Sequence, residues 1–236
     1  MSSVVVPENC VGPPSMGHGG YVGGLLAREI DGAAQITLRQ PTPVGVELEI
    51  VDCGGDRLEL RHGDELLVEA TPGDLDLSVP TPPSIDEARA AEAGSPSHWD
   101  ERGVHPICFG CGLARDDDEG LEIAVGPVTV DGVDQVAAVW RPRADQADAD
   151  GVVDRQWVLA ALDCPGAMAY IADGTRAGLL GRIIFEQFAP VPVETDLVVT
   201  GWQIGVDGRK MLAGTALADA DGTILAAAKA TWFAFT

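Results

Sequence analysis

The stretch GHGGYVGGLLAREI, from Gly17 to Ile30, decides the fold of this chain. A histidine and a pair of glycines come directly before an apolar run, a pattern typical of the point where a helix begins. A second stretch, GVVDRQWVLAALDCPGAMA from Gly151 to Ala169, is similar to the first. There Asp154 stands in place of His18, and Asp163 follows further along. We interpret the two stretches as equivalent helices that form two halves of one site.

The internal repeat continues after each predicted helix. The segment RQPTPVGVELEIV (39–51) pairs with EQFAPVPVETDLVV (186–199), and identical residues such as Gln40 and Gln187 recur at constant spacing. Turn dipeptides such as Asp207-Gly208 separate the short apolar segments that follow, which indicates antiparallel hairpins. Each half is therefore predicted to hold one helix, about four turns long, that buries its apolar face on an antiparallel sheet.

A proline-rich stretch with few large apolar residues separates the two similar segments, between positions 71 and 106. Within it, Ser84 and Glu87 have the spacing of a capping box and predict a short helix over 84–93. We expect an N-terminal half at 1–80, a linker at 81–102 and a C-terminal half at 103–236.

The composition excludes several classes of partner. Fifteen Lys and Arg residues against 37 Asp and Glu give a formal net charge of −22, which disfavours non-specific binding to nucleic acid. No segment reaches the ~20 apolar residues that a membrane span needs, and the N-terminus lacks the pattern of a signal peptide. We therefore expect a cytoplasmic protein with no nucleic-acid and no membrane partner. Five cysteines in such a chain argue against a disulfide framework.

Three motifs resemble the hotdog proteins of the thioesterase superfamily. The segment HPICFGCGLARDDDEGLEI (105–123) resembles the Cys-Phe-x-Cys-Gly … Gly-Leu opening of many such domains. The stretches at 17–30 and 151–169 resemble the helix of the 4-hydroxybenzoyl-CoA and phenylacetyl-CoA thioesterase-like group. Because the resemblance covers both halves, the arrangement is similar to the double hotdogs of acyl-CoA thioesterase II.

This resemblance implies an α+β double hotdog fold. Two tandem hotdog units, each an antiparallel sheet wrapped on a long helix, would form one continuous sheet. It also implies a small-molecule acyl-CoA substrate and no cofactor, and it is compatible with a homodimer of double hotdogs.

The same resemblance predicts one composite site. In single-hotdog relatives, the His-Gly-Gly of one subunit meets an acidic residue on the helix of the other. The template places that acid nine residues after the histidine, which from His18 is Ala27. Counting back nine residues from Asp163 gives Asp154 at the histidine position. Each half thus retains what the other lacks, which leaves one complete site and one without function.

His18 and Asp163 are the predicted catalytic residues. Asp163 would act as general base or as nucleophile, and His18 would donate to the thioester carbonyl or orient a water. The N–H groups of Gly19 and Gly20 would bind the developing oxyanion at the helix N-terminus. Two structural alternatives stay open: the glycine pair could be only a tight entry turn, and Asp163 a capped, solvated kink before Pro165.

A basic pair and a Cys-x-x-Cys motif are two further candidate binding features. Arg209 and Lys210 are an adjacent basic pair after a predicted hairpin turn, and we assign them to CoA binding. Cys108 and Cys111, with His105 nearby, raise the question of zinc, but no second Cys-x-x-Cys supplies further ligands. We therefore expect no metal here.

The predicted function is hydrolysis of an acyl-CoA thioester. The first alternative is a non-catalytic acyl-CoA or lipid-binding hotdog module that uses the same groove without turnover. The second is a structural pseudo-dimer whose groove is filled by its own side chains.

Overall fold

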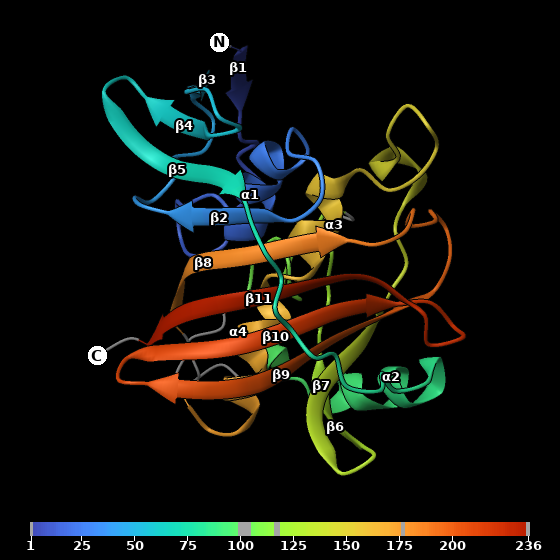
Figure 1. Ribbon diagram of the computed structural model, residues 1–236. Coiled ribbons are helices and arrows are strands. Elements are labelled where there is room, and N and C mark those ends of the chain that lie inside the picture. Colours follow the sequence, from blue (N-terminus) through green and yellow to red (C-terminus); the bar gives the residue numbers. More distant parts are fainter. Residues whose placement is uncertain (1, 99–104, 116–118, 176–177, 235–236) are drawn as a thin grey trace.

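The computed structural model describes residues 2–98, 105–115, 119–175 and 178–234. Within these residues the strands form one 11-stranded sheet in the order β1-β3-β4-β5-β2-β8-β11-β10-β9-β7-β6 (Figure 1), and every neighbouring pair is antiparallel. The strands are β1 (Ser2–Val5), β2 (Ala34–Leu38), β3 (Glu47–Asp52), β4 (Leu58–His62), β5 (Glu65–Pro72), β6 (Gly126–Val130), β7 (Val133–Trp140), β8 (Gly178–Gln187), β9 (Leu197–Asp207), β10 (Lys210–Ala218) and β11 (Ile224–Ala234). The α-helices are α1 (Gly19–Ala27), α2 (Ile85–Ala91), α3 (Arg155–Ala161) and α4 (Cys164–Ala172), with short 3-10 helices at Glu92–Gly94, Pro96–His98 and Ala144–Gln146.

The sheet consists of two mirrored halves joined at β2 and β8. Outward from the joint, the order β2-β5-β4-β3-β1 in the first half corresponds to β8-β11-β10-β9-β7 in the second, and β6 is added at the far edge. At the joint, Ile36 lies opposite Ile183, and both side chains are fully buried. The halves therefore share one core and one continuous sheet, as the internal repeat predicts.

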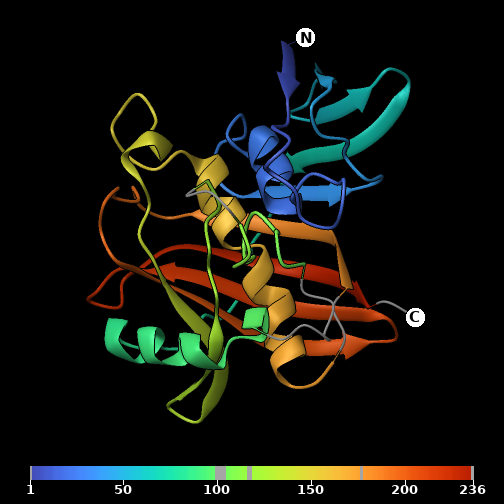
Figure 2. The same ribbon diagram turned by 180° about the vertical axis from the view of Figure 1, so that it is seen from behind.

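Helices α1, α3 and α4 cover one face of the sheet (Figure 2). Helices α1 and α3 are in direct contact through glycines of α1. A Cβ atom on Gly24 would lie 2.6 Å from the Cα of Gln156, and one on Gly20 would lie 2.7 Å from the carbonyl oxygen of Leu159. The two helix backbones thus approach as closely as they do only because no side chain separates them.

The helices are shorter than predicted. Helix α1 has nine residues, and the second predicted helix is divided into α3 and α4 around Leu162 and Asp163. Pro165 explains the division, because it has no N–H to donate and its ring clashes with the carbonyl of the preceding turn. The break places Asp163 at the N-cap of α4, where the chain changes direction.

The opposite face of the sheet is crossed by the segment between β5 and α2 (Figure 1). Its apolar side chains Leu75, Leu77 and Val79 pack against a buried cluster that includes Trp202. Helix α2 begins with the predicted capping box, in which Ser84 and Glu87 each accept the other's backbone N–H. Since α2 packs on β6 and β7, it covers part of the second half; the predicted boundary at 102/103 lies outside the described residues.

No helix in the described part of the chain combines the length and the apolar character that crossing a membrane requires.

Candidate functional site

His18 is the N-cap of α1, and its ring is fixed from both sides. Its Nδ1 accepts the N–H of Tyr21 at 3.2 Å, so the proton of the neutral imidazole is on Nε2. The ring of Phe109 packs edge-on against it, with centroids 5.8 Å apart. With an exposed fraction of 1%, His18 is buried. Because Nδ1 is occupied by the N–H of Tyr21, Nε2 is the ring nitrogen that can interact with other groups.

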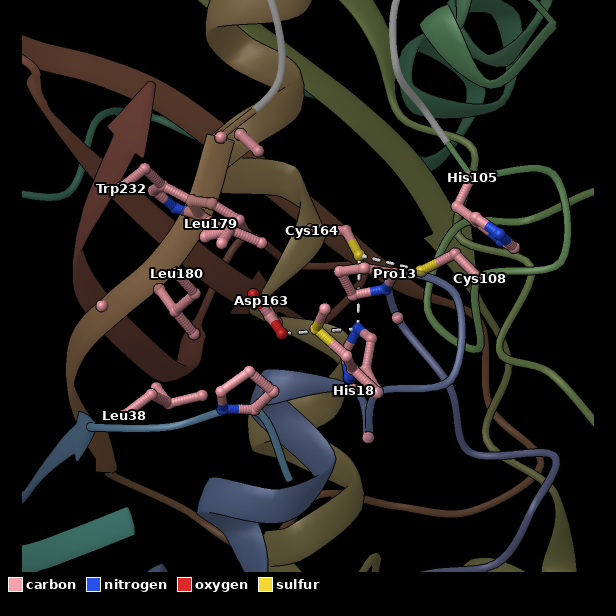
Figure 3. A pocket seen from close by; sticks show the side chains of 18 of the residues that line it. Pro13, His18, Leu38, His105, Cys108, Asp163, Cys164, Leu179, Leu180 and Trp232 are labelled. Carbon is pink, nitrogen blue, oxygen red and sulfur yellow. Dashed lines mark hydrogen bonds and ion pairs between the residues drawn. The ribbon is translucent and has the colours of Figure 1, made fainter. Parts of the chain in front are cut away.

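Asp163 reaches the same point from the second half of the chain. Its Oδ2 accepts the N–H of Gly20 at 2.6 Å and lies 3.4 Å from Nε2 of His18 (Figure 3). Only 3% of Asp163 is exposed, and its side chain makes no capping bond to its own helix. The structure therefore shows a buried carboxylate between the halves and not a solvated kink.

The charges of these two residues influence each other. Burial raises the pKa of the Asp163 carboxyl, and this outweighs the lowering by His18 and by the N–H of Gly20. Burial lowers the pKa of His18, but the Asp163 carboxylate and the Cys108 thiol raise it by more. Among the described residues, Oδ1 of Asp163 has no hydrogen-bond partner, so it is the oxygen free to accept a proton.

Buried thiols lie next to this pair. The Sγ of Cys164 is 3.3 Å from Nε2 of His18, and the Sγ of Cys108 is 3.7 Å from that of Cys164 (Figure 3). Hydrogen bonds from the thiols of Cys111 and Cys164, and from His18, hold the pKa of Cys108 well below its usual range although burial opposes this. Cys164 was not predicted as a site residue from the sequence, and its position directly after Asp163 is the one signal that could have indicated it.

A cavity of about 520 Å³ opens beside these groups. Its wall includes His18, Gly19, Asp163 and the three thiols, and most of its other side chains are apolar. The apolar side chains include Leu38, Met168, Ile171, Leu179, Leu180 and Trp232. The volume is within the roughly 300–1,000 Å³ that is usual for small-molecule sites.

The structure separates the two glycines of the predicted oxyanion site. Gly19 lines the cavity, and no hydrogen bond of its N–H is found among the described residues. Gly20 does not line the cavity, and its N–H is already donated to Asp163. Of the two, only Gly19 both lines the cavity and has an N–H without a partner among the described residues.

Arg209 and Lys210 are not part of the cavity wall, although Lys210 lies opposite Phe233 of that wall in the β10–β11 pair. Both are exposed at the β9–β10 turn. A different cation, Arg39, lines the cavity at an exposed position and forms an ion pair with Glu69 at 3.4 Å. Sequence reasoning passed over Arg39 because a single arginine in a predicted loop carries no pattern of its own.

The equivalent position in the second half is blocked. Asp154 caps α3 by accepting the N–H of Gln156 at 2.9 Å. Arg155, which stands where Gly19 stands in the first half, donates to the carbonyls of Ile30 at 2.8 Å and Gly32 at 2.7 Å. The second helix N-terminus therefore has a structural role in place of an open site.

Solved structures with a similar fold cover nearly the whole chain. A tesB protein of Mycobacterium avium subsp. paratuberculosis has a TM-score of 0.62 at 15% identity, over 96% of this chain and 90% of that one. A conserved protein with hot dog fold from Alicyclobacillus acidocaldarius has a TM-score of 0.61 at 13% identity, over 99% and 92%. Acyl-CoA thioesterase II TesB2 from Mycobacterium marinum has a TM-score of 0.55 at 11% identity, over 92% and 90%.

No protein-family model and no curated protein sequence matches the chain. The structural likeness defines the fold, and the mirrored sheet agrees with it: this chain is a double hotdog protein.

Proposed function

We propose that this chain hydrolyses acyl-CoA thioesters at a single composite site between its two halves. One observation carries the proposal: the second half contributes a buried carboxylate, Asp163, to the N-terminus of α1 in the first half, beside a mainly apolar cavity. A carboxylate so placed can serve as a general base, and the helix N-terminus stabilises negative charge next to it. A thioesterase among the structural neighbours supports the same class of reaction.

The reaction follows from the positions of these groups. The acyl chain would occupy the apolar cavity, with the thioester carbonyl oxygen at the free N–H of Gly19. A water would transfer a proton to Oδ1 of Asp163 while its oxygen attacks the carbonyl carbon, and Gly19 would donate to the developing oxyanion. Collapse of the tetrahedral intermediate breaks the C–S bond. The proton then passes from Asp163 to the departing thiolate, which gives a carboxylic acid and a free thiol.

His18 and Gly20 are assigned to positioning. The N–H of Gly20 holds Oδ2 of Asp163 at 2.6 Å, and Nε2 of His18 approaches the same oxygen at 3.4 Å. Together they occupy Oδ2, so we assign the proton transfer to Oδ1 of Asp163, which has no hydrogen-bond partner among the described residues. Since His18 and both glycines come from the first half and Asp163 from the second, neither half would be active alone.

The phosphates of CoA would lie outside the cavity, since its wall is mainly apolar. Arg39 is the cation at an exposed part of that wall, so we assign it to the CoA phosphates in preference to Arg209 and Lys210. This deviates from the sequence-based assignment, which rested on adjacency of two charges.

The test is a hydrolysis screen with short, medium, long-chain and aromatic acyl-CoAs, in which a thiol reagent detects free CoA. With the best substrate, Asp163→Asn should lower turnover by at least about 10²-fold, the low end of general-base contributions. Asp154→Asn is the matched control, because Asn caps a helix as well as Asp does. Unchanged turnover in Asp163→Asn, or equal losses in both variants, would contradict the composite site. Acyl-CoA binding without turnover by the unaltered protein would identify the non-catalytic module instead.

A further inference from the structure

Three buried side chains from distant parts of the chain meet at one point on the cavity wall. His18 comes from the N-terminus of α1, Cys108 from the Cys-x-x-Cys turn, and Cys164 from the N-terminus of α4. Their Nε2 and Sγ atoms all lie within 4.8 Å of one another. The sequence-based argument against a metal rested on missing ligands, and the fold supplies them. We propose that His18, Cys108 and Cys164 bind one zinc ion.

The distances between the three atoms match a tetrahedral zinc ion. Zn–S bonds of about 2.3 Å and Zn–N bonds of about 2.0 Å place two sulfurs roughly 3.8 Å apart, and a sulfur and a nitrogen roughly 3.6 Å apart. The Sγ atoms of Cys108 and Cys164 are 3.7 Å apart, and Nε2 of His18 lies 3.3 Å from Sγ of Cys164. Small shifts of side chains that are already in place would complete the coordination.

Space for the ion is left beside Gly110, between Cys108 and Cys111. A Cβ on Gly110 would lie 2.6 Å from Nε2 of His18 and 2.8 Å from Sγ of Cys164. That Cβ position is close to both His18 and Cys164. Because Gly110 has no side chain, the position is empty and leaves room for an ion bound to these two residues.

The donor set selects the kind of metal. Two thiolates and one imidazole suit zinc, whereas calcium and magnesium prefer oxygen ligands. Three protein ligands with an open fourth position is the arrangement of catalytic zinc sites. Since His18, Cys108 and Cys164 all line the cavity, the fourth position would face a bound ligand.

Zinc binding requires two changes in the ligands. Each thiol loses its proton as its Zn–S bond forms, so zinc binding releases these protons to solvent. His18 must place its proton on Nδ1, which gives up the hydrogen bond from the Tyr21 N–H. A zinc-bound Nε2 also has no proton to offer Oδ2 of Asp163, so in the metal-bound protein the N–H of Gly20 alone holds that oxygen. The free energy of zinc binding to thiolate sites is roughly tenfold that of one N-cap bond, so the exchange favours the metal.

The experiment is metal analysis of the untagged full-length protein, purified without chelator. About one zinc per chain is expected, and exchange for Co²⁺ should give the thiolate-to-metal charge-transfer absorption and the visible bands of tetrahedral cobalt. Cys108→Ser and Cys164→Ser should each reduce bound zinc at least about tenfold, because losing a direct ligand should cost no less than losing an outer hydrogen-bond partner. Cys10→Ser, at a buried cysteine outside the cluster, and Cys53→Ser, at an exposed one, should retain it.

Unaltered protein without zinc, with Cys108 and Cys164 free or joined as a disulfide in peptide mapping, would overturn the proposal. Retention of zinc by the double variant Cys108→Ser/Cys164→Ser, with a native circular dichroism spectrum, would overturn it as well. The result is separable from the proposed hydrolysis, because Asp163→Asn should lose turnover and keep its zinc. Hydrolysis by protein that contains no zinc when purified without chelator would leave the proposed function standing and reject the metal site.

Discussion

Gly110 illustrates how much of this site depends on a residue with no side chain. The turn that contains it passes so close to His18 and Cys164 that one additional carbon would contact both Nε2 of His18 and Sγ of Cys164. The main chain on either side is anchored, since Phe109 donates its N–H to Val11 at 2.6 Å and the carbonyl of Gly110 accepts from Ile123 at 2.9 Å. The turn therefore has little freedom to retreat.

Gly110→Ala should consequently be costly. An overpacked core position typically loses about 1–3 kcal/mol of stability, and we expect a decrease of this size in urea unfolding. The same carbon would displace His18 and so disturb the carboxylate of Asp163, which should lower acyl-CoA turnover. The control is Gly205→Ala in β9, where an added Cβ has no heavy atom within 4 Å. Equal stability and turnover in both variants would show that the turn can move aside.

Site residues could be predicted from the sequence where they belong to a recognisable motif. His18 and Asp163 were predicted from their places in two similar helices, and the structure brings them together at 3.4 Å, although their roles remain predictions. The thiol of Cys164 could not be placed beside Cys108 from sequence. That contact joins residues 56 positions apart and depends on how the α4 helix restarts after the break. Contacts of this kind are determined by packing, which no local pattern records.

At the scale of elements, Arg155 joins the two halves. It begins α3 in the second half, and its guanidinium donates to two carbonyls of the chain that follows α1 in the first half. The side chain also lies over the ring of Phe185, 5.2 Å from the centroid. One residue therefore fixes the end of one central helix against the start of the other.

Arg155→Ala should lower the free energy of unfolding by about 2 kcal/mol, because hydrogen bonds to a charged group are lost and two carbonyls lose their partner. Arg89→Ala is the comparison, since it removes an exposed arginine whose ion pair with Asp196 at 2.8 Å should contribute at most about 1 kcal/mol. Urea unfolding of the two variants separates the cases. A smaller loss from Arg155→Ala than from Arg89→Ala would mean that α1 and α3 hold together without this contact.

Helix starts and hairpin turns could be predicted from the sequence where a few consecutive residues determine them. The capping box of α2 and the positive φ of Gly63, Gly208 and Gly222 in hairpin turns follow from two to four consecutive residues. The length of the central helices did not follow in the same way. An apolar run continues through Leu162 and Asp163, and only the effect of Pro165 on the preceding turn divides it.

At the scale of the whole molecule, the repeat predicted from the sequence corresponds to the mirrored order of the sheet. Gln40 and Gln187, which mark the repeat, lie just after β2 and at the end of β8, the two strands that join the halves. The repeat could therefore predict a continuous sheet. It could not predict which of the two helix N-termini, that of α1 or that of α3, is available to a ligand. At α3 the Arg155 guanidinium is bound to the carbonyls of Ile30 and Gly32, and this contact does not follow from the repeat.

The final prediction concerns the dependence of each half on the other. Fragments 1–80 and 81–236, produced separately, should each lack a cooperative unfolding transition and acyl-CoA turnover. Separation exposes the edges of β2 and β8 with the buried Ile36 and Ile183, and unpaired strand edges with apolar side chains favour aggregation. It also removes Gly20 from Asp163. Refolded together, the fragments should recover one transition and the turnover.

The matched control is the same pair of fragments with Asp163→Asn in the larger one. This pair should assemble, since Ile36, Ile183 and the rest of the β2–β8 joint are unchanged, and it should show one unfolding transition without turnover. Assembly and catalysis are thereby measured independently. Turnover by fragment 81–236 alone would be decisive against a shared site, because that fragment contains Asp163 but neither His18 nor the α1 N-terminus that holds the carboxylate.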